Sequence, residues 1–218
     1  AWTHDICDNN HPLFVGRPGT IGTRPGNFAV QACDLLIVLG SRLNVRQVSY
    51  NWSAFASNAK IVMVDIDSSE LQKPYLDLEL PIHSDILDFI AQVDSHISLN
   101  ASDLLSLPAL EVRKQWTEKL RQVFTAYSPK DSDYCRPKSG DGINPYHFVF
   151  SLQRYLSDNH QIVCGDATAC IVPFQILSLT CSQRMFSNSG CASMGYDLPA
   201  GIGAAWASND YAFGAPTI

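Results

Sequence analysis

The sequence has little basic charge. It holds 15 Lys and Arg against 21 Asp and Glu, a net charge of −6 at pH 7, and the basic residues nowhere form a run. Nucleic-acid binding requires clustered Lys and Arg to neutralise phosphates, so we expect no nucleic-acid partner. A signal-peptide pattern and an apolar run long enough to cross a bilayer are also missing, so we expect no membrane span.

Cysteine and histidine do not occur in metal-binding patterns. The seven cysteines are odd in number, include no C-x-x-C pair, and several lie within apolar runs. We therefore expect reduced thiols and a cytoplasmic protein, not a disulfide framework or a zinc site. The six histidines are scattered, with no pair at metal-ligand spacing and no arrangement typical of a catalytic triad. The residues alone thus predict neither a metal ligand nor a catalytic nucleophile.

Continuous apolar runs, typical of buried parallel strands, are present at residues 34–40, 60–67 and 161–167. Amphipathic patterns predict helices over residues 26–33, 84–97, 110–124, 144–156 and 197–207. Three of these helices begin with a capping signal: Ser84, Asn144 followed by Pro145, and Asp197 with Pro199 in the first turn. Strands that alternate with helices imply an α/β fold with largely parallel sheets.

The segment 99–142 interrupts this alternation. It holds the charged helix and then "SPKDSDYCRPKSGDG", which is rich in Pro, Gly, Ser and charge. We interpret it as a linker between an α/β unit at 1–98 and a second at 143–218, and its Gly-Asp-Gly as a turn. The first residue is not Met, and the closing "NDYAFGAPTI" is rich in turn residues. We therefore expect an internal fragment, with the first unit incomplete at its start and the second at its end.

A nucleotide site is one interpretation of the first unit. "GRPGTIG" at 16–22 is a Gly-rich loop that leads toward a helix, although it is not the G-x-G-x-x-G fingerprint. Gly40 ends one predicted strand, Arg42 and Arg46 follow it, and Asp65 or Asp67 ends the next. Ligands of open α/β sheets bind beyond the carboxyl ends of the strands. The alternative is that these glycines only make turns and the arginines are solvated.

Two stretches resemble the thiamine-diphosphate-dependent enzymes, acetolactate synthase and its relatives. "GRPGTIGTRPGNFAVQACDLLIVLGSRLNVR" with "NAKIVMVDIDSSELQK" is similar to their central domain, and "GDATACIVPFQ" with "MFSNSGCASMGYDLPAGIGAA" to the first half of their diphosphate-binding domain. The resemblance covers 1–98 and 143–207, in the family's order. It implies two parallel-sheet, three-layer units: a Rossmann-like central domain and an incomplete thiamine-diphosphate-binding domain.

The resemblance also implies an activity: a lyase or transferase that decarboxylates a small 2-oxo acid, using thiamine diphosphate and Mg²⁺, in a homodimer or homotetramer. The positions that match thiamine-diphosphate contacts are Thr168, Ala169, Gly190, Ala192, Ser193 and Met194. Met194 would support the bent cofactor, and the Ala192 backbone would face its amino group; the alternative is that Met194 is an ordinary core residue. The activating Glu and the Mg²⁺ ligands are expected outside the chain, which we expect to be inactive alone.

In the family members that carry FAD, the central domain holds the flavin nucleotide. The positions that match those contacts are Gly16, Arg17, Gly19, Gly40, Arg42, Arg46, Asp65 and Asp85. Thr168 and Ala169 replace a Gln-His pair of the family, and Ser189, Ala192 and Asp197 replace glycines, which favours a sister branch with another substrate. Two alternatives stay open: a non-catalytic nucleotide-binding or regulatory module of this origin, and an unrelated NAD-type enzyme.

Overall fold

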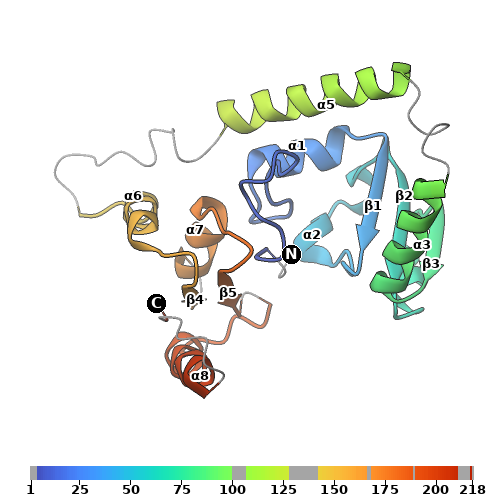
Figure 1. Ribbon diagram of the computed structural model, residues 1–218. Coiled ribbons are helices and arrows are strands. Elements are labelled where there is room, and N and C mark those ends of the chain that lie inside the picture. The colour runs from blue at the N-terminus through green and yellow to red at the C-terminus, as the bar shows by residue number, and fades with distance from the viewer. Residues whose placement is uncertain are drawn as a thin grey trace. The chain divides into compact units, whose positions relative to one another are not determined.

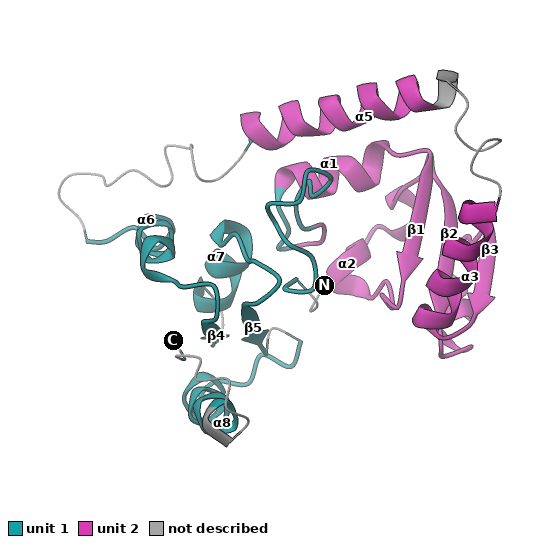
Figure 2. Cartoon of the chain, viewed as in Figure 1, with its two compact units in different colours: residues 1–17, 21–23, 127–218 teal, residues 18–20, 24–126 magenta. Residues whose placement is uncertain are grey.

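The computed structural model describes residues 4–99, 107–127, 142–165, 168–188, 190–210 and 217 (Figure 1). The chain divides into two compact units (Figure 2). Unit 1 comprises residues 1–17, 21–23 and 127–218, and unit 2 comprises 18–20 and 24–126. This division differs from the boundaries expected from the sequence, because the charged helix belongs to unit 2 and the segment before Pro18 to unit 1.

Unit 2 is built on a parallel sheet of β1 (Leu35–Leu39), β2 (Lys60–Asp65) and β3 (Leu80–His83), in the order β1-β2-β3. Its helices are α1 (Arg24–Ala32), α2 (Val45–Val48), α3 (Ile86–Leu99) and α5 (Leu107–Ala126), with short 3₁₀ turns η1 (Trp52–Ala54) and η2 (Glu70–Gln72). The first two strands confirm the prediction from apolar runs. β3 was not predicted, because "LPIH" is short and contains Pro81.

The core of unit 2 lies around the central strand β2, where Met63 and Val64 are fully buried. Val38, Leu43, Val48, Phe55, Ala56 and Ile61 complete it. The strand β1 pairs with one neighbour among the described residues, and its alternate side chains Leu35, Ile37 and Leu39 are 40–53% exposed. A continuous apolar run therefore does not mean burial on both faces here.

The helix α3 begins one residue later than its cap signal predicted. The Asp85 carboxylate, not the Ser84 hydroxyl, accepts from the Leu87 backbone N–H, at 2.7 Å. Ser84 contacts the Asp85 carbonyl instead. Both residues are good helix caps. The Ser84 N–H donates to the Asp65 carbonyl, so Ser84 still continues the pairing of β3 with β2, and the helix begins after Asp85. The prediction that Ser84 is the cap was wrong.

Unit 1 has a parallel pair of strands, β4 (Gln161–Cys164) and β5 (Arg184–Ser187). Its helices are α6 (Pro145–Leu152), continued by the 3₁₀ turn η5 (Gln153–Tyr155), then α7 (Thr168–Ile176) and α8 (Asp197–Asp210). Asn144 caps α6 as predicted, since its side chain accepts from the Tyr146 N–H at 2.9 Å. Both units thus have parallel strands with flanking helices, which confirms the α/β fold class.

The segment before Pro18 is an integral part of unit 1. The Asp5 carboxylate accepts from Arg184 Nε at 2.8 Å and from the Met185 N–H at 3.1 Å. Asn9 pairs with Leu179 through its backbone N–H, which donates to the Leu179 carbonyl, and through its side-chain oxygen, which accepts from the Leu179 N–H. These contacts join the first residues to the core that α7 and β5 form, over 150 residues later in the sequence. Among the described residues, no helix is long and apolar enough to cross a membrane.

Candidate functional site

The carboxyl ends of β1, β2 and β3 meet at one edge of unit 2, because the strands are parallel and in register. The Gly40 N–H donates to the Val64 carbonyl at 2.9 Å and closes the end of β1. Gly40 has a φ of +57°, and a Cβ there would be 2.4 Å from Ile86 Cδ1. The left-handed backbone favours glycine at this position, and a larger residue would have to displace the end of the Ile86 side chain.

Two aspartates follow β2 at this edge. Asp65 is buried, and its carboxylate accepts from the Asp67 N–H at 3.0 Å. The Asp67 carboxylate accepts from the Ser69 N–H at 2.9 Å and from the Ser69 hydroxyl. Hydrogen bonds from Ser69 lower the pKa of Asp67, with smaller contributions from Arg42 and His83. The carboxylates of Asp65 and Asp67 are thus both held by hydrogen bonds from the turn after β2.

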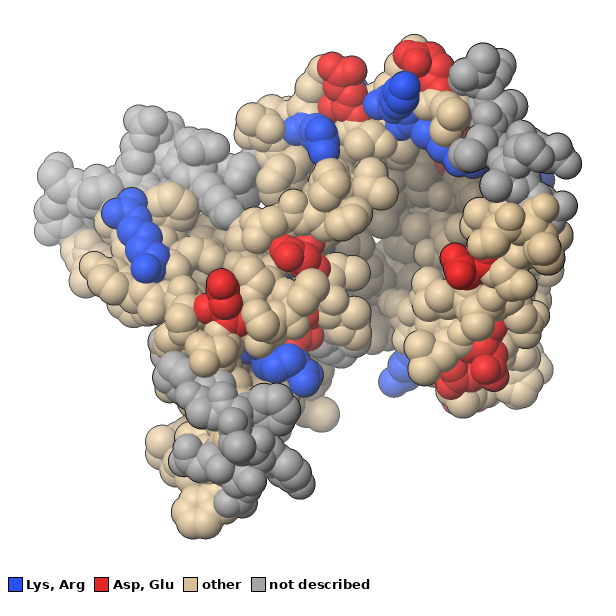
Figure 3. Space-filling view, viewed as in Figure 1, with Lys and Arg blue, Asp and Glu red and all other residues tan. Residues whose placement is uncertain are grey.

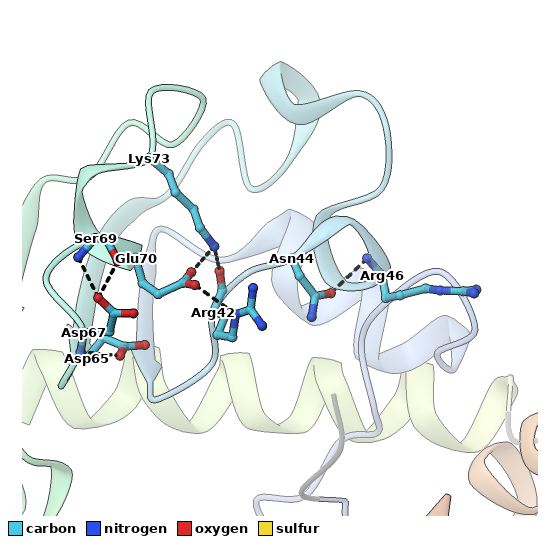
Figure 4. Close-up of polar contacts among 8 residues, drawn as sticks. All are labelled: Arg42, Asn44, Arg46, Asp65, Asp67, Ser69, Glu70 and Lys73. Atoms are coloured by element: carbon cyan, nitrogen blue, oxygen red, sulfur yellow. Dashed lines mark hydrogen bonds and ion pairs between the residues drawn. The ribbon is translucent and has the colours of Figure 1, made fainter. Parts of the chain in front are cut away.

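Arg42 is engaged by residues that the sequence did not single out. Its Nε donates to Glu70 Oε1 at 2.9 Å, and Lys73 Nζ pairs with the other carboxylate oxygen of Glu70 (Figure 4). Lys73 Nζ also donates to the Arg42 carbonyl. The only signal in the sequence is the spacing of Glu70 and Lys73 by three residues in "SSELQK", an ordinary helical pairing.

Gly19 and Arg46 are brought together in unit 2, although 27 residues separate them in the sequence. The Thr20 N–H donates to the Arg46 carbonyl at 2.8 Å, and a Cβ on Gly19, whose φ is +129°, would be 2.9 Å from that carbonyl oxygen. Asn27 fixes Gly19 from the other side through its N–H and carbonyl. The Arg46 side chain is exposed, while its N–H is held by the Asn44 side chain at the start of α2.

Gly16 and Arg17 belong to unit 1, whereas the rest of the predicted nucleotide set belongs to unit 2. Arg17 is 6% exposed, and its guanidinium donates to the carbonyl oxygens of Phe174 and Leu177 and to the Asn9 side chain. Burial lowers the pKa of Arg17 to about 10, and the Asp5 carboxylate acts in the opposite direction. The other six predicted positions, Gly19, Gly40, Arg42, Arg46, Asp65 and Asp85, belong to unit 2, where Gly19 lies beside Arg46 and Asp85 caps α3.

The predicted thiamine-diphosphate loop is an exposed turn of unit 1. Ala192 has a φ of +52° and donates its N–H to the Asn188 carbonyl at 2.7 Å, and Gly195 has a φ of +84°. Met194 is 93% exposed, which contradicts the alternative that it is an ordinary core residue. Gly190 and Ser193 are exposed in the same turn, and Thr168 and Ala169 are the exposed first residues of α7.

The helix α8 continues this exposed surface. Leu198, Ile202 and Trp206 follow one another at four-residue intervals and are 61–72% exposed. At the other face of the helix, the Asp197 side chain lies against Gly165 at the end of β4, and Ser208 accepts from the Gln161 side chain at the start of β4. The loop and the first turns of α8 thus present apolar side chains that nothing in the described part of unit 1 covers.

Charge and metal ligands are sparse around this loop. Residues 168–176 and 190–196 contain no Lys or Arg. No group of three or more His, Cys, Asp or Glu that could hold a metal ion occurs among the residues that the structure describes. On the face shown in Figure 3, acidic and basic side chains are interspersed. An anion bound at the start of α7 would be held mainly by backbone N–H groups and the Thr168 hydroxyl.

The sequence of the chain is similar to those of known proteins. Residues 3–93 match the family model of the thiamine pyrophosphate enzyme central domain. The chain is 30% identical over 201 residues to the acetolactate synthase isozyme 1 large subunit of Escherichia coli, which covers 92% of this chain and 32% of that protein. It is 31% identical over 199 residues to the acetolactate synthase large subunit of Cyanidium caldarium, 89% of this chain and 31% of that protein. The chain therefore spans about a third of the length of these relatives, and the resemblance stated from the sequence is confirmed.

Proposed function

We propose that this relative of the thiamine-diphosphate-dependent enzymes of acetolactate synthase type supplies the central domain and part of the diphosphate-binding domain of such an enzyme. The observation that carries the proposal is the similarity to acetolactate synthase large subunits over 92% of the chain, across both units. The parent protein would be a lyase or transferase that decarboxylates a small 2-oxo acid. The free thiols among the described cysteines support a cytoplasmic location as part of this proposal.

The exposed loop of unit 1 fits the role of a cofactor platform. Ala192 and Gly195 hold the backbone in left-handed conformations, and among the described residues no heavy atom beyond the adjoining residues lies within 4 Å of where a Cβ on Gly190 or Gly195 would be. Met194 extends from this turn and would contact the cofactor rings, while Thr168 and Ala169 at the start of α7 would face the diphosphate. When bound, thiamine diphosphate supplies the carbon nucleophile that attacks the 2-oxo acid and accepts electrons as CO₂ leaves.

The remainder of the active site would come from outside this chain. Mg²⁺ ligands and the activating Glu are placed there by the proposal, which leaves this chain inactive alone. A second catalytic domain, from a partner subunit of a homodimer or homotetramer, would cover the apolar surface of α8. Three large apolar side chains more than 60% exposed on one helix face support such a covering surface.

Unit 2 would act as the nucleotide-type domain of the parent protein, with FAD or another nucleotide as its ligand. Gly40 and Asp65 fit this role because they lie at the carboxyl ends of β1 and β2, and Arg46 fits it as an exposed cation of the same unit. Arg17 does not fit it, because its guanidinium is buried among carbonyl groups of unit 1. Arg42 fits it only if Glu70 releases it.

Hydrogen exchange with millimolar thiamine diphosphate and Mg²⁺ tests the proposal on this chain. We expect the ligand to slow exchange in residues 190–196 and at the start of α7. In Met194→Ala, most of this slowing should be lost. Calorimetry should show no micromolar affinity. Thiamine without the diphosphate is the ligand control. Unchanged exchange at every concentration would overturn the placement of the cofactor, while micromolar binding with CO₂ release from pyruvate would overturn the incompleteness.

A further inference from the structure

Three charged side chains at the carboxyl edge of the unit 2 sheet form a closed group. Glu70 contacts Arg42 with one carboxylate oxygen and Lys73 with the other, and Lys73 also binds the Arg42 carbonyl (Figure 4). Both oxygens of Glu70 are thus committed to cations that follow β1 and η2. The same group ties the loop after β1 to the turn after β2.

The members of this group differ in exposure. The side chains of Glu70 and Lys73 are 13% and 15% exposed, whereas the Arg42 side chain is 66% exposed. Glu70 and Lys73 therefore form the fixed part of the group, and the guanidinium of Arg42 lies over them at the surface. Arg42 is thus the exposed member of the group, and Glu70 would keep Lys73 as a cationic partner if Arg42 turned to another anion.

Acidic side chains outnumber basic ones at this edge. Arg42 and Lys73 lie near Asp67 and Glu70, while Asp65 ends β2 and Asp85 follows β3. An anionic ligand gains no net attraction from such an edge. Removal of the Glu70 charge would take away the one carboxylate that contacts both cations and leave Arg42 and Lys73 available to a phosphate.

We infer that Glu70 acts as an internal anion that occupies Arg42 and Lys73 and so keeps nucleotides and other phosphate-bearing ligands off this edge of unit 2. This inference rests on the proposed nucleotide-type role of unit 2 and specifies how its ligand is controlled. Glu70 stands where a ligand phosphate would accept from Arg42, so ligand and carboxylate compete for one guanidinium. Binding requires Arg42 to exchange one anion for another.

Titration of the chain with ADP and with FAD tests the inference, by calorimetry and by flavin fluorescence anisotropy. We expect Glu70→Gln to bind both at least tenfold more tightly than the unsubstituted chain, since one unit of negative charge leaves the edge. Glu79→Gln is the matched control, because Glu79 pairs with Lys60 at the opposite end of the same sheet, at 3.2 Å. The Glu79→Gln variant should bind ADP and FAD with the same affinities as the unsubstituted chain.

A double variant identifies the released group. In Glu70→Gln with Arg42→Ala, the gain in affinity should disappear, because the freed guanidinium is absent. Circular dichroism and thermal unfolding check that each variant is folded. If Glu70→Gln is not folded, Glu70→Met takes its place, since it removes the charge but keeps the side-chain volume at this half-buried position. Glu70→Met should then show the same gain in affinity for ADP and FAD.

The outcomes separate this inference from the proposed function. Equal or weaker binding by Glu70→Gln, with measurable binding by the unsubstituted chain, overturns the role of Glu70 and leaves the nucleotide domain standing. Absence of binding by every variant overturns both. Neither outcome affects the thiamine-diphosphate loop, which belongs to unit 1 and has its own exchange test.

Discussion

The Asp197 side chain lies directly on Gly165. A Cβ on Gly165 would be 2.9 Å from the Asp197 carboxyl carbon and 3.1 Å from its Cβ, which is closer than carbon atoms pack. Asp197 is the first residue of α8, and Gly165 follows the last residue of β4. The contact therefore fixes where α8 starts over the end of β4, as the hydrogen bond between Gln161 and Ser208 does at the other end.

Replacement of this glycine should loosen the attachment of α8. We expect Gly165→Ala to lower the free energy of unfolding of unit 1 by about 2 kcal/mol, since the new methyl group overlaps a side chain near its backbone and not at a flexible end. Urea denaturation and hydrogen exchange of α8 amides measure the effect. Gly201→Ala in the same helix is the control, because a Cβ there meets nothing within 4 Å, and it should stabilise by about 0.5–1 kcal/mol.

A compensating substitution checks the cause. Asp197→Gly removes the atoms that the new methyl group would meet, so the double variant should lose less stability than the sum of the two single variants. Strict additivity of the two effects would mean that the contact between Gly165 and Asp197 does not explain the loss.

Two methionines of unit 1 should differ in how much stability their substitution by Ala costs. Met194→Ala should change the free energy of unfolding by less than about 0.5 kcal/mol, because this side chain is 93% exposed. Met185→Ala should cost about 2–5 kcal/mol, because Met185 is 2% exposed in the core beside β4. Chemical denaturation of both variants makes the comparison. A loss at Met194 as large as that at Met185 would refute an exposed, ligand-facing role.

Arg17 should behave as a structural residue of unit 1. Its substitution by Ala removes the guanidinium donor from the carbonyl oxygens of Phe174 and Leu177 and one of two donors from the Asn9 side-chain oxygen, which should cost about 3 kcal/mol. Hydrogen exchange of the α7 amides measures the loss of stability in unit 1. Arg46→Ala, at the exposed arginine of unit 2, should stay within about 0.5 kcal/mol. If the two variants proved equally stable, the buried guanidinium would have no structural role.

The sequence predicted those parts of the fold in which one local signal dominates. Apolar runs located β1, β2 and β4, and Asn144 before Pro145 located the start of α6. The helix α7 escaped prediction because it is apolar on all sides and contains Pro173, so it shows neither amphipathic spacing nor an uninterrupted helical pattern. Its place in the fold depends on contacts with residues near the start of the chain.

The candidate sites were less predictable, because a side chain's partners depend on tertiary contacts. The sequence identified Arg17 and Arg42 by their place beside glycines, yet Arg17 is buried at the end of α7 and Arg42 is paired with Glu70. Nothing in the local sequence distinguishes a phosphate-binding arginine from one that binds a carbonyl or a carboxylate. Motif spacing could locate the exposed turn at Met194, whose conformation is largely local.

The thiol of Cys164 gives the chain a pH dependence that can be measured. Burial raises the pKa of Cys164 to about 12, against an ordinary value of 9.0, and the neighbouring Cys170 acts in the same direction. In the folded chain the thiol therefore keeps its proton over a pH range in which the unfolded chain loses it. Its contribution to stability is fully present below pH 9 and is lost as the pH rises toward 12.

We therefore expect the free energy of unfolding of unit 1 to fall by about 1 kcal/mol between pH 8.5 and pH 10 through this group alone. Urea denaturation across this range measures the slope in the reduced chain. Cys164→Ala should have a shallower slope, whereas Cys181→Ala, at an exposed cysteine, should keep the original one. Each variant lacks one thiol and keeps every other titrating group, so a slope that changes in Cys164→Ala but not in Cys181→Ala isolates the buried thiol. Parallel slopes would mean that Cys164 ionises as readily in the folded chain as in the unfolded one.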